Sequence, residues 1–484
     1  MKRLSGTDAL FLSIEEPNWH QHLGGLVIID ATDSPDFSFL GVRELMLERM
    51  TLTPKFMWKL HEIPLKLDLP IWVDDDDFDV DNHLHHVALP APGGHEELAA
   101  LTGKILSRQL DRRRPLWEMW FIEGLPNSRV ALLSKFHHCL LDGMAGASLA
   151  TVLFDFEPDA DPPHIPTGAE VERAGPAPSD AELLARASIS AAATPLRLTN
   201  YLARGAIRGA TLISKVREGV GDVPQHVPTT VFNGPVGPKR RLAFCSVAMD
   251  DVKAVKNHYD VKVNDVVLAV CAGALRHYLD ERGELPEQRL LSMVPVSTRE
   301  EGDDAMDNKV ATMLVSLATD IDDPAERLLA IHESSMGAKE LTAAVRSTEI
   351  PSMGEVIPPA IIGAAVHGLA SSGLMSLMTT VNTAISNVPG PPFPLYIGGA
   401  RVTGIFSASI IAESMGLNIT LFSYMDRVDF GLIVDPDLVP DHWDIADGFH
   451  DALAELMAAA ELGKPTVVED PFGNDSGTRL SETT

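Results

Sequence analysis

The sequence predicts an α/β protein made of two halves of similar size. Its 484 residues exceed what one hydrophobic core usually organises, and 45% of them are hydrophobic, which is enough for two cores. Helical and strand periodicities alternate on both sides of the middle of the chain. Six prolines between residues 158 and 180 mark a linker that separates the two alternating regions.

In the first half, capping and periodicity define the elements. Ser5-Gly6-Thr7-Asp8 is typical of a helix N-terminus. Apolar residues at helical or alternating spacing then predict the remaining elements. The helices expected are 39–50, 96–110 and 143–156, and the strands are 23–29, 117–122 and 130–136.

An alanine-rich helix over 181–220 follows the linker and is the one basic helical stretch in an acidic chain. Arg197, Arg204, Arg208, Lys215 and Arg217 lie within it. Two interpretations stay open for this helix. It is an amphipathic bridge between the halves, or it attracts anionic lipid head groups or the phosphate groups of another ligand.

The second half repeats the alternation from about Arg241. The strands expected are 242–249, 290–296, 311–317, 401–409 and a hairpin over 417–434 that turns at Asp426-Arg427; the helices are 264–282, 324–341 and 443–462. The apolar stretch 359–378 contains glycines, serines and a histidine, so we expect a helix at a domain contact or beside a lipid pocket rather than a membrane span. The domain boundaries expected are 1–157, a linker with the basic helix over 158–240, 241–462, and a disordered tail over 463–484.

Charge and cysteine content limit the function classes. The formal net charge is −29, which argues against nucleic-acid binding and against a broad electrostatic membrane footprint. The first residues lack the apolar core of a signal peptide. Cys139, Cys245 and Cys271 are far apart and outside any CxxC spacing, so neither disulfides nor a zinc site are expected and a reducing cytoplasm fits.

The strongest chemical signal is the run from His137-His138 to Asp142-Gly143, where the strand 130–136 gives way to a helix. A histidine at such a junction faces a cleft, and its near-neutral pKa lets it accept a proton at cellular pH. Asp142-Gly143 favours a turn. Asp142 either orients His138 as the acid of a triad or, as we prefer, fixes the loop from the side away from the cleft.

Three other clusters have simpler explanations than ligand binding. His83, His85 and His86 lie close to the acidic run 74–81, but zinc sites usually draw ligands from distant segments too, so no metal is expected. The acidic run lacks the glycine and terminal glutamate of a calcium loop. Lys239-Arg240-Arg241 is a weak candidate for coenzyme A phosphates.

Several blocks together resemble the bacterial wax ester synthase/diacylglycerol acyltransferase family, within the chloramphenicol acetyltransferase-like and condensation-enzyme superfamily. The superfamily shares only the His138-to-Gly143 element. The blocks similar to the narrower family are Leu4 to Leu12, Pro115-Leu116-Trp117 with Gly124-Leu125, Asn264 to Ala269, Val294 to Arg299, Ser386 to Pro391, and Phe430-Gly431. They occur in family order over residues 3–460. Cys139 departs from the alanine that is common in the family.

The resemblance implies two chloramphenicol acetyltransferase-like α/β sandwich domains that form a pseudo-dimer with a tunnel at their interface. It implies that His138 is the general base of an O-acyltransferase that moves a long-chain acyl group from acyl-CoA to diacylglycerol, giving triacylglycerol. The alternative acceptor is a long-chain fatty alcohol, giving a wax ester. No cofactor is expected beyond the co-substrate acyl-CoA, and no Gly-x-Ser-x-Gly elbow is present. A non-catalytic lipid-binding relative is the third interpretation.

The remaining site residues follow from the same resemblance or stay open. His137 supports the loop or substrate, or is a structural histidine. Asp142 and Gly143 are structural at the site, and superfamily analogy makes Arg299 the partner of Asp142. Asn264 is an ordinary N-cap or faces the oxyanion or thioester, and Ser386 and Asn387 form a tight loop beside the cleft. Peripheral contact with a membrane or lipid inclusion is compatible with these substrates.

Overall fold

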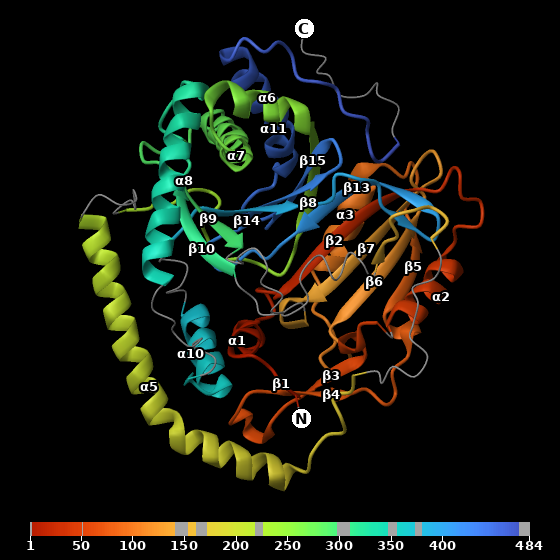
Figure 1. The fold of residues 1–484 in the computed structure, drawn as a ribbon, viewed down its shortest axis with the longest axis vertical. Helices are drawn as coiled ribbons and strands as arrows, with labels where there is room; N and C mark the ends of the chain where they lie inside the picture. Colours follow the sequence, from red (N-terminus) through yellow and green to blue (C-terminus); the bar gives the residue numbers. More distant parts are fainter. Residues whose placement is uncertain are drawn as a thin grey trace.

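The computed structural model describes residues 2–50, 52–140, 153–160, 172–217, 226–297, 310–346, 356–372 and 380–473. Within these residues the strands form two six-stranded sheets and one three-stranded sheet. The two large sheets lie next to each other, with most of the long helices against the sheet of the second half (Figure 1). The α/β prediction with two halves is confirmed.

The N-terminal sheet has the strand order β12-β13-β2-β7-β6-β5, with β5 and β6 parallel and the other neighbours antiparallel. Its strands are β12 (Tyr396–Ile397), β13 (Ala400–Ala408), β2 (His22–Asp30), β7 (Arg129–His137), β6 (Trp117–Glu123) and β5 (Leu84–Ala88). The helices of this half are α1 (Gly6–Ile14), α2 (Phe39–Met50) and α3 (His95–Leu106). The small sheet joins β1 (Lys2–Arg3), β4 (Ile71–Asp74) and β3 (Trp58–His61).

The C-terminal sheet has the order β10-β9-β11-β14-β15-β8 and is mixed, because β11 runs parallel to both β9 and β14. Its strands are β10 (Val310–Ser316), β9 (Leu291–Ser297), β11 (Thr383–Pro389), β14 (Leu417–Tyr424), β15 (Arg427–Val434) and β8 (Arg241–Ala248). Helices α6 (Met249–Tyr259), α7 (Val263–Asp280), α8 (Pro324–Arg346) and α11 (His442–Ala459) accompany it. The run from Val266 to Leu275 in α7 is entirely buried in the core of this half.

The second half of the chain contributes two strands to the first sheet. Strands β12 and β13 follow β11 in the sequence, yet they complete the N-terminal sheet. The backbone N–H of Ile405 in β13 donates to the buried Asp429 carboxylate in β15 at 2.9 Å. A Cβ at Gly431 would overlap the Ser407 carbonyl, so glycine allows the two sheets to meet this closely. The domain boundary expected at residue 241 stays a prediction, because the strands of the N-terminal sheet do not come from one continuous part of the chain.

Two helices lie outside the sheets on one side of the molecule. The long helix α5 (Asp180–Arg217) curves along the periphery, and α10 (Pro359–Ser371) lies between it and α1 (Figure 1). Helix α10 packs on α1. It buries Ile362 and exposes Ile361, and the expectation of a domain contact or a lipid pocket for 359–378 stays a prediction. Among the described residues, no helix is long and apolar enough to cross a membrane.

Most predicted elements are confirmed to within one or two residues, and α2 matches its prediction at both ends. The Ser5 side chain caps α1 by accepting from the Asp8 N–H at 3.1 Å. The helix expected over 96–110 ends at Leu106, where Ser107 caps it. The linker helix begins at Asp180, one residue before the position expected.

Three predictions about secondary structure are wrong. Ser386 to Gly390 was expected to form a tight loop, but Ser386 to Pro389 belong to β11, because they pair in parallel with Thr420 to Ser423 of β14. Residues 463–473 are ordered rather than a disordered tail, because Phe472 is buried and the Thr466 N–H donates to Asp251 at 2.6 Å. Of the helix expected over 143–156, residues 143–152 lie outside the described residues, and residues 154–156 are not helical, since Asp155 pairs with Tyr396.

Candidate active site

His138 lies at the end of a central strand of the N-terminal sheet. Strand β7 ends at His137, and a short 3-10 helix, η4 (His138–Leu140), begins at once. The His138 N–H donates to the Gln21 carbonyl at 2.8 Å. Its ring stacks on Phe11 of α1, with 3.8 Å between ring centroids and 21° between planes. Backbone and ring are thus both positioned; the residue as a whole is partly exposed, while the ring Nδ1 is buried.

His137 is buried, with 1% of its surface exposed. Its Nδ1 accepts from the Cys139 N–H at 3.2 Å, so the proton of the neutral ring resides on Nε2. That Nε2 lies 3.7 Å from Glu15 Oε2. Burial lowers the pKa of His137, against the opposing effect of Glu15. His137 therefore belongs to a buried polar network beneath the His138 loop rather than to the solvent-facing surface.

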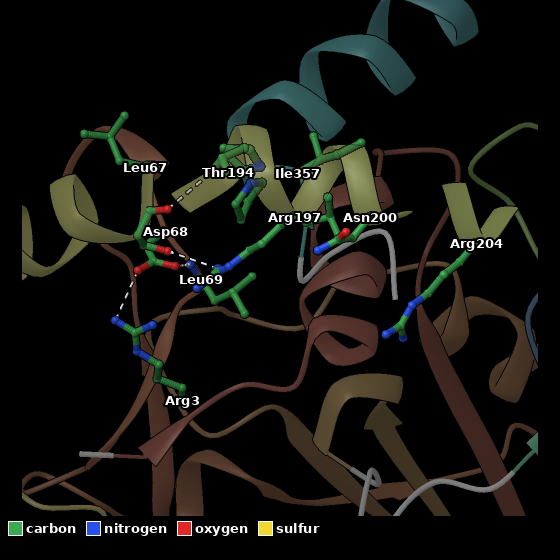
Figure 2. Close-up of a pocket in the computed structure, with 13 residues that line it drawn as sticks. Arg3, Leu67, Asp68, Leu69, Thr194, Arg197, Asn200, Arg204 and Ile357 are labelled. Carbon is green, nitrogen blue, oxygen red and sulfur yellow. Dashed lines mark hydrogen bonds and ion pairs between the residues drawn. The ribbon is translucent and has the colours of Figure 1, made fainter. Parts of the chain in front are cut away.

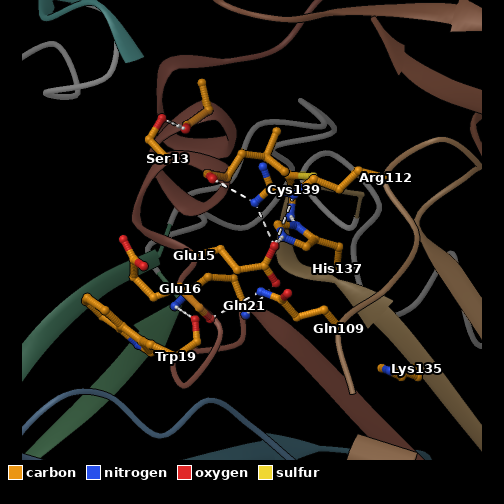
Figure 3. A network of polar contacts seen from close by, with 12 residues as sticks. Ser13, Glu15, Glu16, Trp19, Gln21, Gln109, Arg112, Lys135, His137 and Cys139 are labelled. Carbon is orange, nitrogen blue, oxygen red and sulfur yellow. Dashed lines mark hydrogen bonds and ion pairs between the residues drawn. The ribbon is translucent and has the colours of Figure 1, made fainter. Parts of the chain in front are cut away.

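Glu15 and Arg112 complete this network, in which the three side chains converge (Figure 3). Arg112 donates to Glu15 Oε2 from Nη2 at 2.6 Å and from Nε at 3.2 Å. Glu15 Oε1 accepts from the Gln21 N–H at 3.3 Å. Burial raises the pKa of Glu15, but His137 and Arg112 outweigh it and hold that pKa at about 2. A permanently charged carboxylate therefore ties α1, the segment before β2 and the end of β7 together.

Sequence reasoning did not identify Glu15 or Arg112. They are 97 residues apart, and only the fold brings them together. Arg112 stands three residues before the Pro115-Leu116-Trp117 block, and Glu15 stands three residues after the block that ends at Leu12. Their nearness to both blocks is the one signal that the sequence offered.

A second polar pair lies on the C-terminal half. The Asn387 Nδ2 of β11 donates to the Asn264 Oδ1 of α7 at 3.4 Å, so the structure brings two predicted site residues together. Asn264 is not the N-cap: Lys262 holds that position, and Asp265 accepts from the Lys262 N–H at 3.0 Å. Because successive strand residues face opposite sides, Ser386 points away from the face that carries Asn387.

Three predicted site residues, Asp142, Gly143 and Arg299, lie outside the described residues. Both interpretations of Asp142, the acid of a triad and the partner of Arg299, stay predictions.

The histidines considered as metal ligands have separate partners. His83 Nδ1 lies 2.8 Å from the Trp117 carbonyl oxygen. His85 packs on Trp120, and His86 pairs with Glu123 at 2.9 Å.

Of Lys239-Arg240-Arg241, the weak candidate for coenzyme A phosphates, Arg240 is not available to a ligand, while for the exposed Lys239 and Arg241 this stays a prediction. Arg240 is 5% exposed and donates to the carbonyls of Asn18 and Gly237, each at 2.7 Å. It is therefore a structural residue where the linker meets the N-terminal half.

Comparison with known proteins identifies the fold and family. The wax ester synthase/diacylglycerol acyltransferase catalytic domain matches residues 4–267, and the C-terminal domain of the same family matches residues 306–457. A protein of Mycobacterium tuberculosis that carries the name diacylglycerol O-acyltransferase is 37% identical over 464 residues, which cover 95% of this chain and 91% of the relative. A second protein of that organism with the same name is 37% identical over 90% of this chain and 94% of its own length.

Solved structures agree with this result. The wax ester synthase/diacylglycerol acyltransferase from Marinobacter aquaeolei VT8 superposes with a TM-score of 0.68 at 30% identity, covering 95% of this chain and all of the other. The starter condensation domain of rhizomide synthetase superposes with a TM-score of 0.53 at 12% identity, over 98% of this chain and 97% of that domain. This second likeness shows the fold alone. The chain therefore belongs to the wax ester synthase/diacylglycerol acyltransferase family of acyltransferases.

Proposed function

We propose that this protein transfers a long-chain acyl group from acyl-CoA to the hydroxyl group of diacylglycerol, with His138 as general base. The observation that carries the proposal is the placement of His138. Its ring is stacked on Phe11, its backbone is bonded to Gln21, and the residue as a whole is partly exposed. A base held in this way starts each reaction in its working orientation.

The proposed step is a direct transfer. Neutral His138 takes the proton of the acceptor hydroxyl as the oxygen attacks the thioester carbonyl carbon. The tetrahedral intermediate then collapses, the carbon–sulfur bond breaks, and the imidazolium returns the proton to the coenzyme A thiolate. Proton and leaving group are balanced without a covalent enzyme intermediate, and no cofactor is needed besides the acyl-CoA co-substrate.

The Asn264–Asn387 pair is proposed to contact the reacting carbonyl or the thioester. Because the Asn264 oxygen accepts from Asn387, its amide nitrogen is the group suited to donate to a developing oxyanion. His137, Glu15 and Arg112 are positioning residues in this scheme. They hold the strand end from which His138 projects, at the interface where we expect the substrate tunnel.

A long-chain fatty alcohol is the second candidate acceptor, since one base serves either hydroxyl and the Marinobacter structure bears the name of both activities. Diacylglycerol and fatty alcohols are both poorly soluble in water. We therefore propose that the protein meets its acceptor at the surface of a membrane or lipid inclusion, while acyl-CoA arrives from the cytoplasm.

The test is acceptor competition. Purified protein is given palmitoyl-CoA with equal amounts of diacylglycerol and hexadecanol, and the products are identified by mass spectrometry. We expect triacylglycerol as the main product. His138→Ala should lower the rate with both acceptors by about 10²- to 10⁴-fold, the usual contribution of a positioned base. The matched control is His86→Ala, which removes a surface histidine paired with Glu123 and should leave the rate unchanged.

Three results would contradict parts of the proposal. Wax ester as the dominant product reverses the choice of acceptor. Full activity in His138→Ala removes the general base. Binding of acyl-CoA by the wild type without turnover with any alcohol favours a lipid-binding relative that has kept the fold.

A further inference from the structure

Helices α7 and α8 are joined by a histidine–carboxylate pair that lies next to Asn264 in the sequence. The His332 Nδ1 of α8 lies 2.6 Å from the Asp265 Oδ2 of α7. Asp265 is 1% exposed, and the His332 side chain is 23% exposed. Because an ionised carboxylate only accepts hydrogen bonds, Nδ1 is the ring nitrogen that carries the proton in this pair. A short hydrogen bond therefore connects two helices that share the core of the C-terminal half.

The same carboxylate closes the turn that contains Asn264. Asp265 Oδ2 also accepts from the Lys262 N–H at 3.0 Å, and the Asp265 N–H donates to the Lys262 carbonyl at 3.0 Å. Asn264 lies inside this turn, one residue before Asp265. Its side-chain oxygen accepts from Asn387 at 3.4 Å. The backbone of Asn264 is therefore held by Asp265, while its amide group is held by Asn387 of β11.

A second contact shows how α8 lies along α7. Arg327 of α8 is 1% exposed, and its side chain donates to two backbone carbonyls at 3.0 and 3.2 Å. A Cβ at Gly273 of α7 would lie 3.4 Å from Arg327 Nη2, so the two helices are close at this point. Five residues later α8 reaches Asp265, eight residues before Gly273, so the helices run in opposite directions. The packing of α8 on α7 thus fixes His332 beside the first turn of α7.

The cavity beside α5 gives this pair no other use. A cavity of about 430 Å³ lies between α5, the start of α10 and the segment before β4 (Figure 2). Its described lining includes Arg3, Asp68 and Arg197, and it contains no residue of α7 or α8. His332 therefore takes no part in binding a ligand there. The printed contacts of His332 lead to Asp265 and, through it, to the turn that carries Asn264.

The pair resembles the buried network of the N-terminal half. There, Glu15 accepts from a backbone N–H and faces His137. Here, Asp265 accepts from a backbone N–H and from His332. In both halves a buried carboxylate joins a histidine to the backbone beside a residue with a proposed role in the reaction. A buried carboxylate held in this way is costly to leave without its partners, so it keeps the surrounding backbone in one arrangement.

We propose that His332 is a positioning residue for acyl transfer. It holds Asp265, and Asp265 holds the turn from which the Asn264 amide contacts the reacting carbonyl or the thioester. This role rests on the proposed function, in which Asn264 donates to the developing oxyanion. A donor placed in advance stabilises the transition state more than the bound substrate, so loosening the turn lowers kcat and leaves KM almost unchanged.

The experiment measures kcat and the KM for palmitoyl-CoA by release of the coenzyme A thiol, with the acceptor that gives the higher turnover. His332→Phe keeps a ring and removes the donor. We expect kcat to fall about tenfold, the equivalent of one hydrogen bond, and KM to change less than about twofold. His332→Asn places an amide N–H where Nδ1 lies and should restore most of the wild-type kcat. His332→Ala, which lets water reach Asp265, carries the same test if His332→Phe does not fold.

A double-substitution cycle shows whether His332 acts through Asn264. Asn264→Ala should lower kcat at least about 10²-fold, the usual effect of losing an oxyanion donor. Adding His332→Phe to Asn264→Ala should lower kcat further by less than about twofold, because the group that His332 positions is gone. The matched control is His277→Phe. It breaks a pair of the same kind, 3.2 Å from Glu455, near the other end of α7 and should leave kcat unchanged.

The other outcomes overturn the inference. An unchanged kcat in His332→Phe, whatever its stability in urea, makes the pair structural only. Effects of His332→Phe that are as large with Asn264→Ala as without it mean that His332 acts on another group. Equal losses in His332→Phe and His277→Phe mean a general effect on α7. The proposed function fails by different results: a wild-type kcat in Asn264→Ala removes the oxyanion donor, and full activity in His138→Ala removes the general base.

Discussion

Replacing Glu15 by glutamine removes one charge from the buried network and keeps its shape. The side chain of Glu15 is 3% exposed, and its carboxylate accepts from Arg112 and from the Gln21 N–H while facing His137. Glutamine can still accept a hydrogen bond from Arg112. What it loses is the charge that balances the guanidinium group, so the substitution tests electrostatics rather than packing.

The size of the effect follows from the ionisation of Glu15. Its pKa lies at about 2 in the folded chain, against a usual value of 4.5. At about 1.4 kcal/mol per tenfold change in the ionisation constant, the ionised carboxylate stabilises the fold by about 3 kcal/mol at neutral pH. Because the folded pKa is the lower one, this stability is present above pH 4.5 and is lost as pH falls towards 2. Glu15→Gln should therefore unfold more easily at pH 7 and lose less stability on acidification.

The assay is urea unfolding followed by tryptophan fluorescence from pH 7 down to pH 3. We expect the free energy of unfolding at pH 7 to fall by about 2–3 kcal/mol in Glu15→Gln. Glu182→Gln is the control, since Glu182 and Arg186 form an exposed pair on α5 that contributes about 0.3–0.5 kcal/mol. The reasoning would be refuted if Glu15→Gln and the wild type had the same free energy of unfolding at pH 7 and lost it equally as the pH was lowered to 3.

Four further predictions follow from other parts of the molecule. Phe11→Leu should lower kcat about tenfold and change KM for acyl-CoA less than about twofold, because the His138 ring loses its stacking partner; an unchanged kcat would remove Phe11 from the site. Gly431→Ala should destabilise the fold by more than about 2 kcal/mol, since its Cβ overlaps the Ser407 carbonyl, and thermal unfolding would show a wild-type midpoint if this contact were unimportant. Burial raises the pKa of Cys139, Cys245 and Cys271, so native protein should resist iodoacetamide at pH 8 and urea-unfolded protein should react three times; native labelling by mass spectrometry would contradict this. Arg240→Met should lower the thermal midpoint without affecting the KM for acyl-CoA, because its donors hold backbone carbonyls; a raised KM would restore its role in binding coenzyme A.

Much of the fold was predictable from local signals. Apolar periodicity located α2 and the β14–β15 hairpin, and the Ser5 cap located α1, because caps and periodicity are written within a few residues. Strand β11 was mistaken for a loop. Its sequence carries Pro and Gly turn signals, and it is the pairing of Ser386 to Pro389 with β14, about 30 residues later in the chain, that makes this part a strand.

The candidate site divides in the same way. His137 and His138 were found because adjacent histidines at a strand end are visible in the sequence. Glu15 and Arg112 were not, since an ion pair between residues 97 positions apart leaves no local pattern. Asn264 and Asn387 were named separately, and their contact depends on how α7 lies against β11. Long-range pairing is thus the information that one sequence does not display.

The position of β12 and β13 in the N-terminal sheet has a consequence for folding during synthesis. The N-terminal sheet contains β13, which ends at Ala408, so its edge remains open until more than four-fifths of the chain has been synthesised. Unpaired strand edges are prone to association while they wait for a partner. The N-terminal sheet is therefore completed only after β13 has been synthesised. Separating the halves by truncation would leave this sheet incomplete and prone to aggregation.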